Sequence, residues 1–142
     1  MDSLGNPIWQ ANYGVRWMGI CEDASIGYML VGNQVLAHVD ANGNMLWEKD
    51  MPFSLEKCIR TLDGNYAAVG SLGNTKIALV RFDENGTAIN IASFGLVNFP
   101  SIPISAYDIK QAEDSSLIVC GSLVGYNFTK EAFLLKTQGN AR

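Results

Sequence analysis

The side chains of this 142-residue chain that are capable of acid–base chemistry are few and scattered. His38 is the single histidine, and it lies in the apolar run 36–39 with no serine or cysteine arranged beside it as a nucleophile. Histidine serves as a general base or a metal ligand in many sites. In a β-strand it more often faces solvent or a neighbouring structural unit. We therefore expect His38 to be structural, and a catalytic or metal-binding histidine is the alternative.

The three cysteines, Cys21, Cys58 and Cys120, are odd in number and show no C-x-x-C spacing. They therefore predict neither a zinc site nor a complete set of disulfides. Each lies in or beside a predicted strand, where a free cysteine usually behaves as a small apolar residue. We expect buried structural thiols, with a redox or nucleophilic role as the alternative.

One segment, 40–44, begins like a calcium-binding loop because Asp40 and Asn42 alternate before Gly43. A helix-flanked calcium loop needs glycine at its sixth position and glutamate at its twelfth. Met45 and Met51 occupy those positions. The segment is therefore interpreted as a hairpin turn, and the sequence predicts no metal site and no bound cofactor.

The same kind of turn recurs along the chain, and this periodicity predicts the architecture. Glycines at positions 5, 43, 86 and 139 each follow or lie within a polar turn, and they are separated by 38, 43 and 53 residues. A repeat of roughly 40–45 residues is typical of one four-stranded β-propeller blade.

Within the clearest repeat, short apolar or alternating runs predict strands over 57–62, 66–69 and 77–82. Polar turns containing glycine, at 63–65 and 83–86, separate them. Such turns supply the positive φ that tight antiparallel hairpins require. The repeat is therefore predicted to be an antiparallel meander.

A further strand is predicted after each turn glycine, over 8–13, 45–50 and 88–93. Trp9 and Trp47 each lie four residues after a turn glycine, whereas Asn90 occupies the corresponding position in the third repeat.

These elements predict an all-β protein with three four-stranded antiparallel blades of a β-propeller, forming one unit over 1–142. The prediction comprises an N-terminal outer strand over 6–14 and blades at about 15–50, 56–94 and 105–138. The N-terminal strand completes the last blade and covers its open edge, in its own chain or in a partner. Because propellers close with four to eight blades, we expect a homodimer with six blades. A fragment of a longer chain is the alternative.

Two segments resemble known propeller repeats. The segment 37–47 resembles the blade motif of quinoprotein-like propellers, in which an alanine, an aspartate, a turn glycine and a tryptophan recur and the tryptophan docks between adjacent blades. The segment 62–86 is similar to repeats in uncharacterised bacterial propeller proteins. The resemblance covers nearly the whole chain and implies a propeller fold. Dehydrogenases of this type bind pyrroloquinoline quinone with calcium, whereas assembly scaffolds with the same blades bind no cofactor.

The overall charge disfavours one class of partner. The net charge of −4 and the pI near 4.8 argue against a nucleic-acid-binding surface, which needs clustered Lys and Arg. The sequence has no apolar run of about 18 residues, so no membrane span is predicted. No signal peptide is visible, and the compartment stays open between the cytoplasm and a fragment of a secreted protein.

The loops supply the only indication of function. One end of the predicted blades carries short acidic turns, and the opposite end carries longer loops that contain aromatic residues and arginine. Such residues dominate binding interfaces. We therefore predict a noncatalytic binding or scaffold module that binds a protein, peptide or glycan across the loop-rich face. The alternative is a cofactor-binding or enzymatic propeller, with a site shared between subunits or lost by truncation. The candidate binding residues are Arg16, Trp17, Phe53, Phe99, Tyr126 and Phe128. Trp17, Phe53 and Phe99 would otherwise cover blade ends or form a dimer contact.

Overall fold

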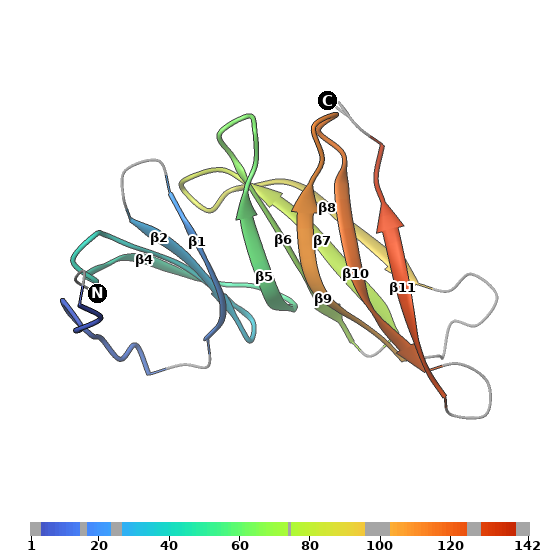
Figure 1. Ribbon diagram of the computed structural model, residues 1–142, viewed down its shortest axis with the longest axis horizontal. Coiled ribbons are helices and arrows are strands. Elements are labelled where there is room, and N and C mark those ends of the chain that lie inside the picture. The colour runs from blue at the N-terminus through green and yellow to red at the C-terminus, as the bar shows by residue number, and fades with distance from the viewer. Residues whose placement is uncertain are drawn as a thin grey trace.

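Eleven β-strands and no helix are found in the part of the chain that the computed structural model describes, residues 4–14, 17–23, 27–73, 75–95, 103–124 and 129–138 (Figure 1). They form three antiparallel sheets of four, four and three strands. The first sheet contains β1 (Trp17–Glu22), β2 (Tyr28–Gly32), β3 (Val35–Val39) and β4 (Met45–Asp50). The second contains β5 (Ser54–Arg60), β6 (Tyr66–Leu72), β7 (Lys76–Phe82) and β8 (Ala88–Gly95). The third contains β9 (Ile104–Gln111), β10 (Leu117–Val124) and β11 (Lys130–Lys136).

Each sheet is a meander in which neighbours in sequence are neighbours in space. The sheets correspond closely to the predicted ranges 15–50, 56–94 and 105–138, and the predicted strands over 57–62, 66–69 and 77–82 are confirmed. The all-β fold class and the antiparallel pairing were therefore correct. The third sheet has three described strands where four were predicted, counting the strand from the N-terminus.

The hairpin turns share one hydrogen-bonding pattern, seen in the five-residue loops 40–44, 61–65, 83–87 and 112–116. In each, the first N–H donates to the fifth carbonyl, and the fourth N–H donates back to the first carbonyl. The fourth residue has positive φ in every case, and it is glycine in three loops but Ser115, with φ +69°, in the last. An aspartate carboxylate accepts backbone N–H groups inside each turn, as Asp40 does from Asn42 and Asn44 at 2.9 Å. Local side-chain chemistry therefore fixes the hairpins that the sequence predicted.

The three sheets pack face to face around two apolar cores. The first core lies between the first and second sheets and includes Met29, Val31, Leu36, Leu55, Val80 and Phe82. The second core lies between the second and third sheets and includes Val69, Ile77, Leu79, Ile109, Leu117 and Val119. The second sheet therefore has both faces covered.

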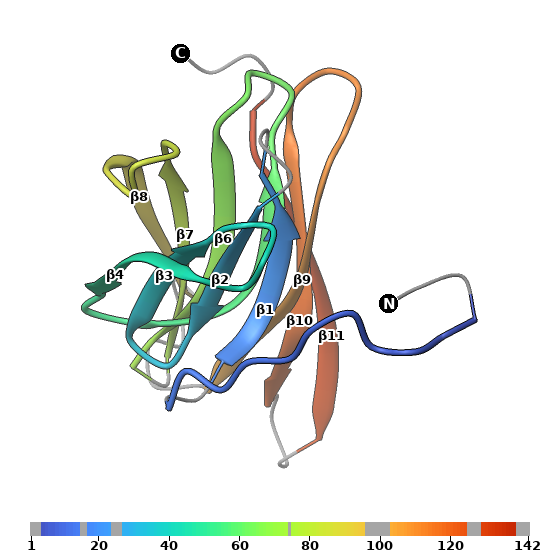
Figure 2. The same ribbon diagram turned by 90° about the vertical axis from the view of Figure 1, so that its left-hand side faces the viewer.

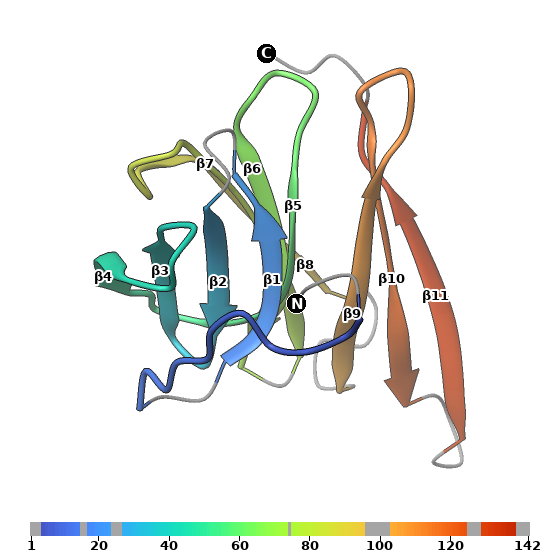
Figure 3. The same ribbon diagram turned by 60° about the vertical axis from the view of Figure 1, so that its left-hand side comes forward.

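The first strand of each sheet lies along the same side of the molecule. β1 contacts β5, and β5 contacts β9, and Figure 3 shows the three side by side. Gly19 in β1 makes the close approach possible, because a Cβ at that position would lie 2.5 Å from the carbonyl oxygen of Glu56. The first-strand edges of the three sheets thus lie next to one another, and the sheets diverge from there.

The N-terminal segment differs from the prediction of an outer strand over 6–14. Residues 4–14 form no strand, and they cross the first sheet instead of pairing with the third (Figure 2). The Trp9 Nε1–H donates to the Ala41 carbonyl at 2.9 Å, and the Tyr13 hydroxyl donates to the Gly43 carbonyl at 2.6 Å. These bonds hold the segment at the first sheet, at the opposite end of the molecule from β11 (Figure 1).

Candidate functional site

Tryptophan side chains fill the contact between successive units at two places. Trp47 on β4 lies against the β7–β8 turn, where a Cβ on Gly86 would come within 2.6 Å of the indole. Trp9 lies in the same way against the β3–β4 turn, where a Cβ on Gly43 would come within 2.7 Å of its ring. Both turn glycines are therefore needed for indole docking as well as for the turn itself.

The corresponding position on the second sheet has no indole. Trp47 pairs with His38 across β3 and β4, and Asn90 pairs with Arg81 across β7 and β8, so the two residues occupy equivalent places. Asn90 is exposed. Beside it, between the second and third sheets, lies a pocket with a volume of about 710 Å³. This volume is in the range of small-molecule sites.

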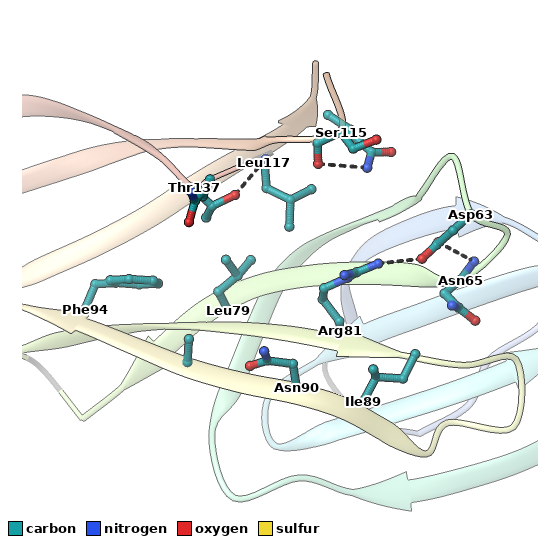
Figure 4. A pocket seen from close by; sticks show the side chains of 13 residues that line it. Asp63, Asn65, Leu79, Arg81, Ile89, Asn90, Phe94, Ser115, Leu117 and Thr137 are labelled. Carbon is teal, nitrogen blue, oxygen red and sulfur yellow. Dashed lines mark hydrogen bonds and ion pairs between the residues drawn. The ribbon is translucent and has the colours of Figure 1, made fainter. Parts of the chain in front are cut away.

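The pocket combines an apolar side with many polar groups (Figure 4). The apolar lining residues come mostly from β7 and β8 and are Leu79, Ile89, Ala92, Phe94 and Leu117. The uncharged polar lining residues are Asn65, Asn90, Gln111, Ser115, Thr137 and Gln138. Asp63 and Arg81 complete the wall. Strand alternation explains the mixture, because Asn90, Ala92 and Phe94 share the β8 face that turns toward the third sheet.

One ion pair sets the charge of the pocket. The Arg81 Nη2 donates to Asp63 Oδ2 at 2.6 Å, and the Thr61 hydroxyl donates to Asp63 Oδ1 at 2.5 Å. The Thr61 hydroxyl, the Asn65 amides and the Arg81 charge hold the pKa of Asp63 below its usual value of 3.8. The carboxylate therefore stays ionised beside the guanidinium, and the two formal charges cancel. The Arg81 Nε is buried and has no hydrogen-bond partner among the described residues.

Some polar groups of the pocket are fixed by the fold and others are free. Gln111 accepts from the Leu62 N–H at 2.7 Å and donates to the Ser115 carbonyl at 3.2 Å. The Thr137 hydroxyl oxygen accepts from the Leu117 N–H at 2.9 Å. The amides of Asn90 and Gln138 make no hydrogen bond within the described ranges and are available to a ligand.

Two of the six residues predicted to bind a partner are described, and they lie in different places. Phe53 is 5% exposed and belongs to the first core. Trp17 is half-buried on the other side of the first sheet, where its ring meets Tyr13 edge-on. Its Nε1 is buried and has no hydrogen-bond partner in the part of the chain that the structure describes. The structure does not bring the two together. The predicted residues Arg16, Phe99, Tyr126 and Phe128 lie outside the described residues.

The histidine and cysteines have clear environments. His38 is half-buried, its Nε2 is hydrogen-bonded to the Asp23 carboxylate, and its ring lies 5.8 Å from the Trp47 ring, measured between centroids. The Sγ atoms of Cys21 and Cys58 are 2.9 Å apart, and Cys58 is buried as predicted. The hydrogen bond to Cys21, together with burial, raises the pKa of Cys58. The prediction of burial was wrong for Cys120, which is exposed because it lies on the face of β10 that turns away from the second core.

The described ranges were also searched for metal sites and for membrane-spanning helices. No three His, Cys, Asp or Glu side chains in them gather closely enough to hold a metal ion. Within those ranges there is also no helix with the length and hydropathy needed to cross a membrane.

Sequence reasoning missed the pocket because its walls come from two sheets. The 13 lining residues span positions 63–138 and no local motif connects them. The one available signal was Asn90, which breaks the tryptophan spacing seen in the first two repeats. That signal marked a difference between repeats but gave no sign of a cavity.

Comparison with known proteins finds a similar fold but gives no information on function. No protein-family profile matches the sequence, and no curated protein sequence matches it. Among solved structures, the chain is similar to a protein of unknown function from Bacteroides caccae, with a TM-score of 0.51 and 9% sequence identity. The similarity covers 88% of this chain, which spans 63% of the length of that protein. At this identity the likeness concerns the fold alone.

Proposed function

We propose that this chain is a noncatalytic binding module built from propeller blades, and that its ligand binds in the pocket between the second and third sheets. The observation that carries the proposal is the pocket itself, which joins an apolar side to free amides at the Asn90 position. Convergent polar groups around an apolar surface are typical of ligand sites. The loop-rich face stays a second predicted surface, since most of its candidate residues lie outside the described ranges.

The arrangement of the sheets supports a propeller. In a propeller the first strand of every blade lies nearest the axis, and neighbouring blades pack face to face. The consecutive contacts of β1 with β5 and of β5 with β9 agree with such an axis. The docking of Trp9 and Trp47 on the turn of the following sheet also agrees with it.

Exposed apolar residues on the two outer faces support a ring of six blades from two copies. On the outer side of the first sheet Ile20 is 59% exposed, and on the outer side of the third sheet Leu134 is 75% exposed. Trp9 lies against the turn glycine of the first sheet, just as Trp47 on β4 lies against the turn glycine of the second sheet. Residues 4–14 therefore correspond in position to the outer strand of a preceding blade. In a two-chain ring that preceding blade is the partner's third sheet, whose β11 has no strand beside it on its outer edge among the described residues.

Light scattering tests the ring, and protein-detected NMR tests the binding function. We expect a mass of two chains, reduced to one chain by Leu134→Glu, because a charge would then face the partner. Lys49→Glu, an exposed change on β4, serves as the control and leaves the dimer intact. A monomeric parent protein would contradict the ring.

For binding, we expect small probes to shift the amide resonances of Asn90, Phe94 and Gln138. A broad library of probes that shifts none of these resonances would contradict the binding function.

A further inference from the structure

We propose that the pocket between the second and third sheets binds a neutral saccharide, an inference that rests on the binding function proposed above. Three properties of the lining lead to this ligand class: its charge, its hydrogen-bonding groups and its apolar side. Each excludes a different set of competing ligands.

The charge of the pocket favours an uncharged ligand. Among the described lining residues, Arg81 and Asp63 are the two with a formal charge, and they bind each other at 2.6 Å. The guanidinium is therefore already neutralised where an anion would bind, and the carboxylate is neutralised where a cation would bind. A charged ligand would have to disrupt this pair and lose its own hydration.

The hydrogen-bonding groups match hydroxyl groups. A sugar hydroxyl donates and accepts at once, and an amide side chain offers both a carbonyl acceptor and an NH₂ donor. Asn90 and Gln138 supply free amides on opposite walls of the pocket, one from β8 and one after β11. The Thr137 hydroxyl, whose oxygen already accepts from the Leu117 N–H, has its own proton left to donate.

The apolar side matches the other half of a sugar ring. A pyranose carries C–H groups on its faces and hydroxyls around its rim, so it needs a ring or aliphatic surface beside its polar partners. Phe94 offers an aromatic ring, and Leu79 and Leu117 extend the apolar surface toward Thr137 (Figure 4). A purely aromatic ligand would leave the free amides of Asn90 and Gln138 unused, whereas a sugar hydroxyl can bond to either of them.

The equivalent contact between the first and second sheets explains why the pocket is open. There Trp47 occupies the position of Asn90, and its indole fills the space beside the turn glycine. Asn90→Trp should therefore fill the pocket with the side chain that the chain itself uses elsewhere. Ile91→Trp is the matched control, because Ile91 is the next residue on β8, faces the opposite side and is 54% exposed.

The experiment is titration by isothermal calorimetry and ligand-detected NMR with methyl glucoside, methyl galactoside, N-acetylglucosamine and maltose. We expect at least one sugar to bind, with affinity reduced at least about tenfold by Asn90→Trp and changed by no more than about twofold by Ile91→Trp. Gln138→Ala, at an exposed position, should also weaken binding about threefold to tenfold without altering the fold.

Indole and uracil, tested in parallel, separate the possible failures. If neither sugars nor these ring probes bind, both the saccharide inference and the binding function are wrong. If a ring probe binds, Asn90→Trp removes it and no sugar binds, the saccharide inference is wrong and the binding function holds. A sugar that binds Asn90→Trp as tightly as the parent protein also overturns the inference, because its site is then elsewhere.

Discussion

The contact between the first and second sheets and the contact between the second and third sheets involve equivalent strand positions, but they differ in packing. Between the first and second sheets Trp47 covers the His38–Asp23 pair and reaches the turn at Gly86. Between the second and third sheets Asn90 leaves the Arg81–Asp63 pair beside an open pocket. The comparison teaches that the contact with an indole at this position is packed, whereas the contact with an asparagine there has a pocket beside it.

A basic side chain paired with a carboxylate is common to all three sheets. His38, Arg81 and Lys136 occupy equivalent places on the third strand of each sheet, and each binds an aspartate in or beside the first turn. The backbone positions of these pairs are therefore equivalent, whereas the residue on the neighbouring strand differs, Trp47 beside His38 and Asn90 beside Arg81. The indole closes one contact, and its absence leaves the other accessible.

The largest effect is expected from removing the docked indole. Trp47→Ala should lower the free energy of unfolding by about 2–3 kcal/mol, because it opens a cavity in a half-buried contact. The matched change Asn90→Ala should alter it by less than about 0.5 kcal/mol, since that contact is already open. Urea denaturation of both variants measures the difference. Equal losses would show that the two contacts do not differ as described.

A smaller difference, about 1–2 kcal/mol between two glycine variants, separates docking from turn geometry. Gly86→Ala places an alanine at a positive φ of 77°, where it is strained, and adds a Cβ that meets the Trp47 ring. It should lower the free energy of unfolding by about 2–3 kcal/mol. Gly64→Ala has a similar φ of 86° but no atom within 4 Å of the new Cβ, and should cost about 1 kcal/mol. Thermal unfolding compares them. The docking account fails if Gly64→Ala is as destabilising as Gly86→Ala.

The turn beside the pocket should accept a stabilising change. Ser115 has φ +69° where the other three turns have glycine, so Ser115→Gly should relieve backbone strain. The expected gain is about 0.5 kcal/mol after the greater flexibility of glycine in the unfolded chain is counted. A rise in the midpoint of thermal unfolding measures it. A loss of stability would mean that the serine side chain has a stabilising role in the pocket wall.

The smallest effect is a pH dependence at the Arg81–Asp63 pair, because both side chains are partly exposed. The pKa of Asp63 is lower in the folded than in the unfolded chain, so its contribution to stability is present above pH 3.8 and is lost as the pH falls through the folded pKa. Asp63→Asn should be less stable than the parent protein at pH 7, and this difference in stability should shrink as the pH falls below 3.8. Denaturation curves at pH 7 and at a series of lower pH values test this. A difference that grows on acidification would contradict it.

Several features of the fold were predictable because they depend on neighbours in sequence. The turns at Asp40, Asp63 and Asp83 form through bonds from a carboxylate to N–H groups two to four residues away, so composition alone indicates them. Strand alternation then gives the buried faces. The resemblance of segment 37–47 to the quinoprotein-like blade motif implied docking of its tryptophan between units, and the Trp47 indole lies against the turn glycine Gly86.

Other features were not predictable because they depend on residues far apart in the chain. The N-terminal segment was predicted as a strand, yet the bonds of Trp9 and Tyr13 to the β3–β4 turn hold it across the first sheet. Phe53 was predicted to face a partner, and the structure packs it into the first core. The short Sγ–Sγ distance between Cys21 and Cys58 likewise arises from the packing of β1 against β5.

The sequence by itself determined the three antiparallel meanders and the position at which the third repeat lacks its tryptophan. Hydrogen bonds within a turn and side-chain alternation along a strand act over a few residues, and a sequence records both. The tertiary structure decided that the loss of one indole opens a pocket, since the space between two sheets depends on how both faces pack. That packing combines side chains from positions 63–138, and no single segment of the chain specifies it.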